Sequence, residues 1–386
     1  MTGGLGLLKN RSLFIDQGVV KGIGDARSFA VRTRTIDARS CVVMPGFIDC
    51  HTHLVWAGSR EDEFARRLAG ISYEQIAREG GGIMSTVEQT RAADENELYR
   101  LARARLWTMI REGTTTVEIK SGYGLSCEEE LKTLRVIRRL QQTMPIDIVP
   151  TYLVHAVPRG LTRRAYVRQV TEEILPAVAR QGIAEFCDIF CDATAFTRAD
   201  SRRILSRARA CRMRLKIHAD ELTNSGGANL AAELGCISAD HLIHTTANAF
   251  RRMKAAGVMP VLLPGTSLYL ARERKPAVRL LSRAHIPFAL ASDYNPGTCL
   301  IYALPRIVAL ACLRYGVDIE SALLGITRHA ARALARHRYA GIIRIGAPAD
   351  IVILRVDTYR KIAYLFGEDL VAHVIKKGTI IYGKNR

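Results

Sequence analysis

Short apolar runs rich in β-branched residues alternate along the chain with longer stretches in which apolar residues recur every three or four positions. The runs are typical of buried strands, and the stretches are typical of amphipathic helices. Eight runs are candidate strands of one parallel sheet: residues 46–53, 114–120, 147–155, 186–191, 215–219, 238–241, 259–263 and 288–292. Eight strand–helix repeats predict an α/β fold of the TIM-type (β/α)8 barrel, whose active site lies at the C-terminal strand ends.

The stretch after the second predicted strand shows how a helix start is encoded. Ser126 is a favoured N-cap residue, and the Glu129 side chain can return a hydrogen bond to it in a capping box. Four apolar residues then fall on one face: Leu131, Leu134, Ile137 and Leu140. We therefore predict a helix that packs against the barrel.

Both ends of the chain have a different pattern. They offer short strand candidates separated by glycine and aspartate turns: residues 12–15, 19–23, 34–37, 350–354 and 371–382. Two β-rich ends that flank a barrel predict one small β-sheet domain assembled from residues 1–44 and 344–386. The catalytic barrel then occupies residues 45–343.

The composition is that of a globular protein. Of the 386 residues 48% are hydrophobic, which excludes an intrinsically disordered chain. No apolar run reaches the roughly 18 residues of a membrane-spanning helix, and the N-terminus lacks the pattern of a secretion signal. Nine scattered cysteines without a C-x-x-C pair indicate reduced thiols. We expect a cytoplasmic protein that does not enter a membrane.

The charge is strongly basic, because 56 lysines and arginines stand against 37 acidic residues and give a net charge of +19. Such a charge favours nucleic-acid binding in general. The sequence, however, has no run of five or six basic residues and no RNA-binding motif with interleaved aromatic residues. We interpret the charge as a solvated surface and expect no nucleic-acid partner. The alternative is a nucleic-acid-binding protein on an inactive barrel, whose binding would weaken steeply with salt.

Histidines gather where the active site of the barrel is expected. Five of the ten lie at or beside the end of a predicted strand: His51, His53, His155, His218 and His241. His51 and His53 are alternate residues that can point the same way, and Asp293 follows the eighth strand. Three imidazoles and a carboxylate suit zinc or a comparable metal and leave room for a water molecule. Each residue could be structural on its own, but their shared position favours a metal site.

Several segments resemble one enzyme family. Residues 43–54 (VMPGFIDCHTHL) are similar to the opening strand of the amidohydrolase superfamily. Six further segments resemble imidazolonepropionases: residues 56–64 (WAGSREDEF), 80–87 (GGGIMSTV), 115–124 (TTVEIKSGYG), 155–158 (HAVP), 216–221 (KIHADE) and 292–298 (SDYNPGT). The resemblance runs from residue 42 to residue 386. It implies hydrolytic opening of the ring of 4-imidazolone-5-propanoate to N-formimino-L-glutamate, the third step of histidine degradation.

The resemblance also implies a site, residue by residue. Its metal ligands would hold one zinc or iron ion: His51, His53, His218 and Asp293. Its substrate contacts would be Arg60, Tyr123, His155, Glu221, Asn295, Gly297 and Thr298. His241 would lie beside the reacting water. Because members of the family are commonly dimers, we also expect a homodimer.

The residue types suit this reaction. The ring carbonyl is amide-like, so water must be activated, and a bound metal lowers the pKa of water to about 7. Glu221 is our first candidate to move the proton to the leaving nitrogen, and Asp293 is its competitor. His241 could hydrogen-bond the water or the oxyanion. Arg60 could bind the substrate propionate through two parallel hydrogen bonds. No lysine ends the fourth strand, so we expect one metal rather than a bridged pair.

Some features leave alternatives open. The three glycines at positions 80–82 lack the strand and the Lys-Ser/Thr ending of a phosphate-binding loop. We expect a shorter N-terminal region than in the family, and His329 stands where the family usually has asparagine. The competing interpretation is another mononuclear amidohydrolase, such as a cyclic-amidine or nucleobase deaminase. Such an enzyme would share the metal ligands but would not need Arg60 and Tyr123 to hold a carboxylate.

Overall fold

The eight predicted barrel strands are all present. The computed structural model describes residues 4–29, 34–71, 75–76, 79–271 and 273–383. Its largest sheet contains eight strands in chain order: β4 (Phe47–Asp49), β5 (Thr114–Lys120), β6 (Asp147–Val154), β7 (Phe186–Cys191), β8 (Arg214–Ala219), β9 (Ser238–His241), β10 (Met259–Leu262) and β11 (Ala289–Leu290). Every pairing between neighbours is parallel. The predicted α/β barrel is confirmed, although β4 and β11 are shorter than expected.

The chain beyond these two short strands closes the barrel. β4 and β11 are the end strands of the sheet. The backbone N–H of Asp293 donates to the carbonyl of His51 over 3.0 Å, and the N–H of His53 donates to the carbonyl of Tyr294 over 3.0 Å. These two hydrogen bonds close the seam between β4 and β11. They join the two segments that carry predicted metal ligands and hold those segments against each other.

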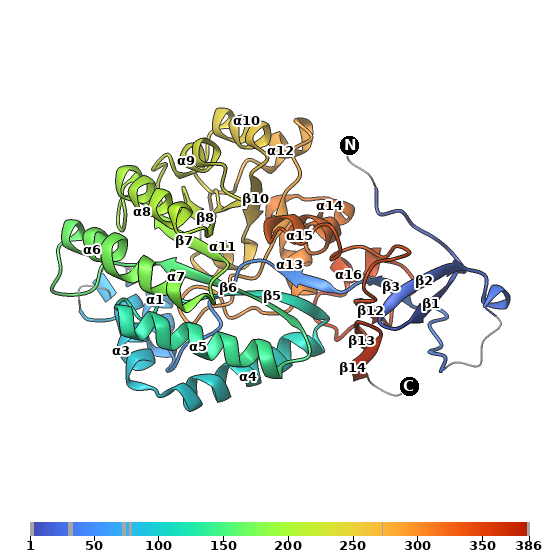
Figure 1. Cartoon of the computed structure of the whole chain (residues 1–386). Coiled ribbons are helices and arrows are strands. Elements are labelled where there is room, and N and C mark those ends of the chain that lie inside the picture. Colours follow the sequence, from blue (N-terminus) through green and yellow to red (C-terminus); the bar gives the residue numbers. More distant parts are fainter. Residues whose placement is uncertain (1–3, 30–33, 72–74, 77–78, 272, 384–386) are drawn as a thin grey trace.

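Helices surround the sheet (Figure 1). The α-helices of the described residues are α1 (Glu61–Leu68), α3 (Ile83–Ala92), α4 (Glu95–Arg111), α5 (Cys127–Thr143), α6 (Arg163–Gln169), α7 (Leu175–Gln181), α8 (Arg198–Ala210), α9 (Gly227–Leu234), α10 (Ala247–Ala256), α11 (Pro264–Tyr269), α12 (Val278–Arg283), α13 (Leu304–Leu310), α14 (Ile319–Gly325), α15 (Arg328–Ala333) and α16 (Arg360–Tyr364). On α4 the buried residues Leu98, Ala102, Leu106 and Met109 recur at helical spacing. Within the described residues, no helix is long and apolar enough to cross a membrane.

The start of α5 differs in one respect from the prediction. The Ser126 hydroxyl accepts the Glu129 N–H, as expected of an N-cap. The Glu129 carboxylate, however, lies 2.6 Å from Lys132 Nζ and pairs with it one turn further along the same helix. The neighbouring carboxylate, that of Glu130, is buried and turns back toward the preceding loop. The expected helix therefore forms, but a different glutamate satisfies the backbone near its start.

The two chain ends build antiparallel sheets beside the barrel (Figure 1). One sheet is a hairpin of β1 (Ser12–Asp16) and β2 (Val19–Gly24). The other has the order β14-β13-β12-β3 and combines β3 (Val42–Pro45) with the C-terminal β12 (Ile351–Leu354), β13 (Val371–Lys376) and β14 (Thr379–Gly383). The boundaries expected for a composite domain stay a prediction, and residues 1–3, 30–33 and 384–386 of that domain lie outside the described residues.

One predicted strand at the N-terminal end is wrong. Residues 34–37 form no strand, and Val42–Pro45 pairs with β12 instead. The Asp37 side chain accepts the Arg39 N–H over 3.0 Å, which is the local hydrogen bond of an aspartate turn. The apolar residues Val43 and Met44 supply the regular pairing that a turn segment cannot make.

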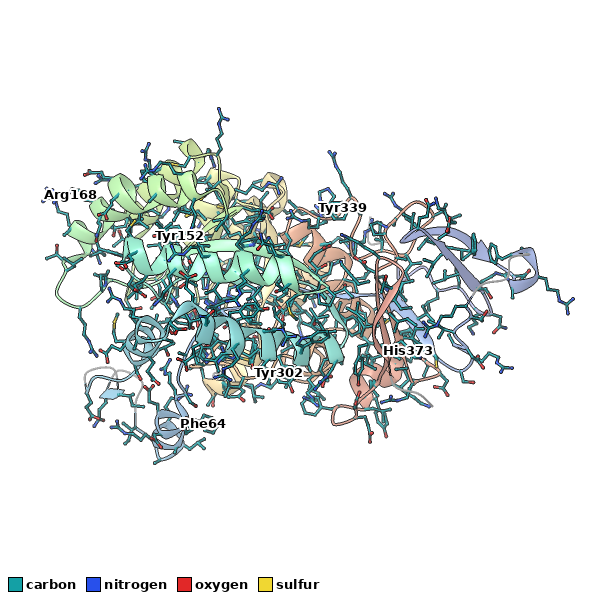
Figure 2. The ribbon with its side chains drawn as sticks, turned by 60° about the horizontal axis from the view of Figure 1, so that its bottom comes forward. Phe64, Tyr152, Arg168, Tyr302, Tyr339 and His373 are labelled. Atoms are coloured by element: carbon teal, nitrogen blue, oxygen red, sulfur yellow. The ribbon has the colours of Figure 1, made fainter. Side chains whose placement is uncertain are left out.

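A buried ion cluster joins the second small sheet to the barrel. Lys376 on β13 donates to Asp147 at the start of β6 over 2.8 Å and to Asp350 over 2.7 Å. Asp350 also accepts the N–H of Lys377 over 2.9 Å. Figure 2 shows that this sheet, marked by His373, lies at the opposite end of the molecule from Phe64 on α1. We refer below to Lys376, Asp147 and Asp350 as the junction cluster.

Candidate active site

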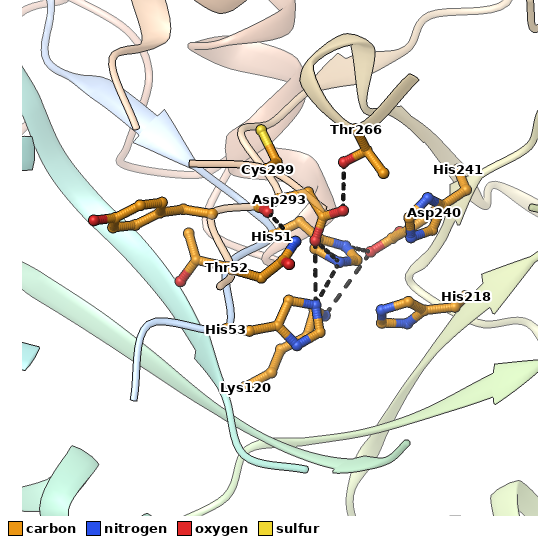
Figure 3. Close-up of polar contacts among 12 residues, drawn as sticks. His51, Thr52, His53, Lys120, His218, Asp240, His241, Thr266, Asp293 and Cys299 are labelled. Atoms are coloured by element: carbon orange, nitrogen blue, oxygen red, sulfur yellow. Dashed lines mark hydrogen bonds and ion pairs between the residues drawn. The ribbon is translucent and has the colours of Figure 1, made fainter. Parts of the chain in front are cut away.

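Five strand-end side chains converge at the mouth of the barrel (Figure 3). They come from the ends of four strands that lie far apart in the sequence: His51, His53, His218, His241 and Asp293. All are less than 5% exposed. The imidazole centroids of His51 and His218 are 4.5 Å apart, and those of His218 and His241 are 5.2 Å apart. The barrel topology thus brings together the residues that strand-end position had predicted to be neighbours.

Three of these side chains each place one polar atom close to the other two. Nε2 of His51 lies 3.3 Å from Nε2 of His53, and Oδ1 of Asp293 lies 3.3 Å from His53 Nε2 and 3.5 Å from His51 Nε2. Tetrahedral bonds of about 2.0–2.1 Å to a zinc ion require ligand atoms about 3.3–3.4 Å apart. The triangle therefore already has the spacing that a single bound cation requires.

His218 faces the same point and has an unsatisfied atom. Among the described residues, neither of its buried ring nitrogens has a hydrogen-bond partner of good geometry. One of them, Nδ1, lies 3.1 Å from Asp188 Oδ2, within ion-pair distance. A buried polar nitrogen without a partner is costly in a folded protein, and a cation at the triangle would satisfy Nε2.

The electrostatic surroundings favour the metal-binding forms of His51, His53 and Asp293. For His218 burial acts downward, but the nearby Asp188 raises its pKa above the ordinary value. Burial lowers the pKa of His51 well below its ordinary value, and the nearby Lys120 charge acts in the same direction. Burial also lowers the pKa of His53. For Asp293 burial acts upward, but the hydrogen bond with His53 and the charge of His241 hold its pKa below the usual range. Neutral imidazoles and an ionised carboxylate are the forms that bind metals.

Backbone contacts and hydroxyl groups fix these ligands. Thr266, at the start of α11, donates from its hydroxyl to Asp293 Oδ2 over 2.5 Å. Asp293 and His241 have φ angles of +53° and +76°, which are strained for residues with a Cβ. Such strain is maintained only where surrounding contacts enforce it, and it clusters at functional sites.

Glu221 lies next to His241, with 3.5 Å between Glu221 Oε2 and His241 Nε2. Burial lowers the pKa of His241 to about 3. The Glu221 loop is held by Asp192, which accepts the N–H groups of Leu222 and Thr223 over 3.2 and 3.1 Å. Glu221 and His241 are therefore close enough to exchange a proton at the edge of the histidine group.

Arg60 packs against Gly297, and both residues are predicted substrate contacts. A Cβ at Gly297 would overlap Nη1 of Arg60, so only glycine allows this approach. The guanidinium donates to Glu63 Oε2 from Nε over 2.9 Å and from Nη2 over 2.7 Å. Arg67 donates to the Gly297 carbonyl over 3.1 Å. Two arginines therefore flank one turn of the loop that follows Asp293.

Tyr123 and His155 form an aromatic wall beside His53. Their ring centroids are 5.6 Å apart, and His155 is stacked on His53 with 5.2 Å between centroids. Glu130 anchors the Tyr123 loop, because its carboxylate accepts the N–H groups of Gly122, Gly124 and Leu125. Glu130 was not predicted to belong to the site, although a glutamate in the first turn of a helix after a glycine-rich loop was a usable signal.

Asn295 and Thr298 organise the loop that carries Gly297. The Asn295 side-chain oxygen accepts the N–H groups of Gly297 and Thr298 over 2.9 and 2.7 Å. Its amide nitrogen donates to the carbonyl of Asp293 over 2.6 Å. These bonds hold the turn that presents Gly297 to Arg60. A direct contact of Asn295 with substrate stays a prediction.

Two further residues that support the site were missed. Thr266 donates to Asp293, and its place three residues after a predicted strand could have identified it. Arg105 lies over the Trp56 ring, with 3.4 Å between its Cζ and the ring centroid, and donates to the carbonyls of Leu54 and Trp56. Arg105 comes from the middle of α4, so nothing in the sequence links it to the histidine strand.

The chain is similar to known proteins over most of its length. The chain matches the amidohydrolase family over residues 42–381. It is 47% identical over 358 residues to an imidazolonepropionase of Symbiobacterium thermophilum, covering 92% of this chain and 84% of that protein. It is 44% identical to an imidazolonepropionase of Geobacillus kaustophilus, covering 98% and 91%.

Solved structures show the same fold at low sequence identity. A zinc-bound adenosine deaminase from Xanthomonas campestris has a TM-score of 0.74 at 17% identity and covers 98% of this chain and 90% of its own. A 5-methylcytosine deaminase from Klebsiella pneumoniae has a TM-score of 0.76 at 19% identity and covers 97% and 95%. At this level of identity the similarity concerns the fold alone.

Proposed function

This chain belongs to the amidohydrolase family, among its imidazolonepropionases, and we propose that it hydrolyses 4-imidazolone-5-propanoate to N-formimino-L-glutamate in histidine degradation. The reaction adds water across an amide-like C–N bond of the ring. It needs an activated water, a group that carries a proton to the leaving nitrogen, and an anchor for the propionate. The barrel mouth offers a candidate for each need.

The observation that carries the proposal is the triangle of His51 Nε2, His53 Nε2 and Asp293 Oδ1, with edges of 3.3 to 3.5 Å. We propose that these atoms, with His218 Nε2 as the fourth ligand, hold one zinc or iron ion. When bound, such an ion lowers the pKa of water and polarises the ring carbonyl. The donor set of imidazoles and one carboxylate suits either metal.

We propose that Glu221 takes the second proton of the attacking water and delivers it to the leaving ring nitrogen. Its carboxylate lies within 3.5 Å of His241 and in a loop that Asp192 holds in place. The lowered pKa of His241 keeps that ring neutral at pH 7. A neutral imidazole can donate one hydrogen bond to the developing oxyanion while Glu221 moves the proton. Asp293 remains the competitor for the proton transfer.

We propose that Arg60 binds the substrate propionate. Its guanidinium is nearly buried, with 8% of the side chain exposed, and a paired carboxylate (that of Glu63) already occupies two of its donors. Nη1 faces Gly297, where any side chain would block it. The Tyr123–His155 wall would then contact the flat imidazolone ring, because aromatic rings favour stacked or edge contacts.

The test is an assay of the purified protein. Loss of imidazolone absorbance is followed before chelation, after chelation and after return of zinc or iron. We expect turnover that disappears on chelation and returns with one metal equivalent per chain. Cytosine and guanine serve as control substrates, and we expect no turnover of either. Turnover of a nucleobase without turnover of the imidazolone would overturn the proposal in favour of a deaminase.

We also propose that the protein is a homodimer, as the family resemblance implies. Sedimentation velocity of the purified chain tests this: a single species with twice the mass of one chain supports it, and a monomer at micromolar concentration contradicts it.

A further inference from the structure

A layer of charged residues fills the barrel directly beneath the histidines. Five ionisable side chains from four strands point inward there and have no exposed surface: Glu118, Lys120, Asp188, Lys216 and Asp240. TIM-type barrels usually fill this space with bulky aliphatic residues. A buried ion cluster is weak support for stability, because apolar residues of similar volume often serve as well or better. The layer therefore calls for another explanation.

Within the layer each lysine links two acceptors. Lys120 Nζ lies 2.7 Å from Asp188 Oδ2 and 2.9 Å from Glu118 Oε2. Lys216 Nζ lies 2.7 Å from Glu118 Oε2 and donates to the Cys50 carbonyl over 2.9 Å. Cys50 directly precedes the first histidine of the His-x-His pair. Lys216 thus also fixes the backbone of the strand that carries the pair.

The top of the layer contacts two of the proposed metal ligands, and Figure 3 shows one of these contacts, between Asp240 and His51. Asp240 Oδ2 lies 2.6 Å from His51 Nδ1, and Asp188 Oδ2 lies 3.1 Å from His218 Nδ1. A carboxylate on Nδ1 fixes the ring orientation and leaves Nε2 for a cation. The lysines contact both carboxylates in turn: Lys120 donates to Asp188 over 2.7 Å, and Lys120 and Lys216 lie at ion-pair distances of 3.9 and 3.8 Å from Asp240 Oδ2.

The charges of the layer also suit a cation above it. Three carboxylates and two lysines leave one negative charge, and Asp293 at the mouth adds a second. Because the surroundings are buried and little screened, this surplus acts strongly on an ion at the histidines. Removal of one lysine would leave carboxylates that repel each other and would free them to turn away from the imidazoles.

We propose that Lys120 and Lys216 are positioning residues for the metal site: they hold Asp188 and Asp240 against Nδ1 of His218 and His51, so that both rings present Nε2 to the ion. This inference rests on the proposed function, because it presumes a metal at the barrel mouth. It assigns the layer to metal binding rather than to fold stability.

The junction cluster supplies a matched control. Lys376 is also a buried lysine held between two carboxylates, but it lies in the small sheet. We compare Lys120→Met, Lys216→Met and Lys376→Met with the wild-type protein. The readouts are zinc affinity by competition with a chromophoric chelator, the visible spectrum of the cobalt-loaded protein, and thermal unfolding of the metal-free proteins.

We expect Lys120→Met and Lys216→Met to lose about 10- to 100-fold in zinc affinity and to show a changed cobalt spectrum. Lys376→Met should bind zinc as the wild type does, despite a lower melting temperature. Wild-type affinity and an unchanged cobalt spectrum in folded Lys120→Met and Lys216→Met would overturn the inference. A wild-type protein that binds no metal would overturn the proposed function itself, so the two failures are distinguishable.

A single substitution in this layer leaves an unbalanced buried charge and can prevent folding. The double variant Glu118→Gln/Lys216→Met removes one charge of each sign and avoids that problem. It still breaks the link from Lys216 to Cys50 and Asp240. We expect a loss of zinc affinity of at least several-fold. Wild-type affinity in this variant would contradict the role of Lys216.

Discussion

Two ion clusters built around buried lysines have the same local chemistry and different surroundings. Each holds a lysine between two carboxylates less than 3 Å away: Lys120 in the layer beneath the barrel mouth and Lys376 in the junction cluster. In the junction cluster both carboxylates have further polar contacts that lie outside the barrel mouth. Asp350 also accepts a backbone N–H, and 36% of the Asp147 side chain is exposed to solvent. In the barrel layer, by contrast, the carboxylates continue upward to imidazoles whose far nitrogens face a common point.

This difference separates a structural role from a functional one. The hydrogen bonds of the junction cluster do not reach the proposed metal ligands, so this cluster stabilises the contact between β13 and β6. The carboxylates of the barrel layer contact side chains that we propose as metal ligands, so this layer sets the orientation of those ligands. The predictions below test this contrast, beginning with the largest expected effect on turnover.

Substitution of a ligand should have the largest effect. We expect His51→Ala to lower the rate of ring opening by at least about a thousandfold, because a metal ion supplies several kcal/mol to the transition state. His373→Ala, which removes a histidine of the small sheet, should retain wild-type turnover. Both are measured by loss of imidazolone absorbance, with circular dichroism to verify the fold. An active His51→Ala protein would contradict the metal site.

Metal removal should affect turnover and stability together. A chelator should abolish turnover, and the melting temperature should fall because the ion binds only the folded protein. At a free metal concentration 100 times Kd the ion contributes about 2.7 kcal/mol. Calorimetry of the wild type and Lys376→Met should show the same metal-dependent increment in both. An increment that vanishes in Lys376→Met would mean that the two clusters are coupled.

Gly297→Ala tests the carboxylate anchor without removing a charge. The new methyl group overlaps Arg60 Nη1 and displaces the guanidinium. We expect kcat/KM to fall about 10- to 100-fold, mostly through KM, because a charge-assisted hydrogen bond contributes about 1.5–3 kcal/mol. Gly367→Ala is the control, since a Cβ there meets no atom within 4 Å. An unchanged KM in Gly297→Ala would remove Arg60 from the proposed substrate contacts.

Lys376→Met should have the smallest effect on turnover. We expect kcat/KM to stay within about twofold of the wild type, while the free energy of unfolding falls by about 2–4 kcal/mol. The stability loss follows from two carboxylates left without their cation, reduced somewhat by the exposure of Asp147. Chemical denaturation and the absorbance assay measure the two quantities. A large fall in turnover with little loss of stability would reverse the assignment of the two clusters.

Much of the fold could be predicted because its signals are local. Most barrel strands are short, largely apolar runs bounded by turns, and six of the eight were predicted to within one residue at each end. The seam strands β4 and β11 were predicted too long, because residues beyond them pair across the seam instead of continuing the ladder. The strand expected at residues 34–37 does not form, because the Asp37 side chain accepts the Arg39 N–H in a local turn. Val42–Pro45 pairs with β12 instead.

The sequence by itself determined which residues stand at the strand ends, because the period of the hydrophobic pattern and the chemistry of each side chain are written in the chain. It therefore determined the fold class and which side chains could serve as ligands. Only the tertiary structure decided which atoms of those side chains meet. The contacts between Asp240 and His51, Thr266 and Asp293, and Arg60 and Gly297 join residues 27 to 237 positions apart. Barrel closure brings such residues to within hydrogen-bond distance, and no local pattern in the chain encodes that distance.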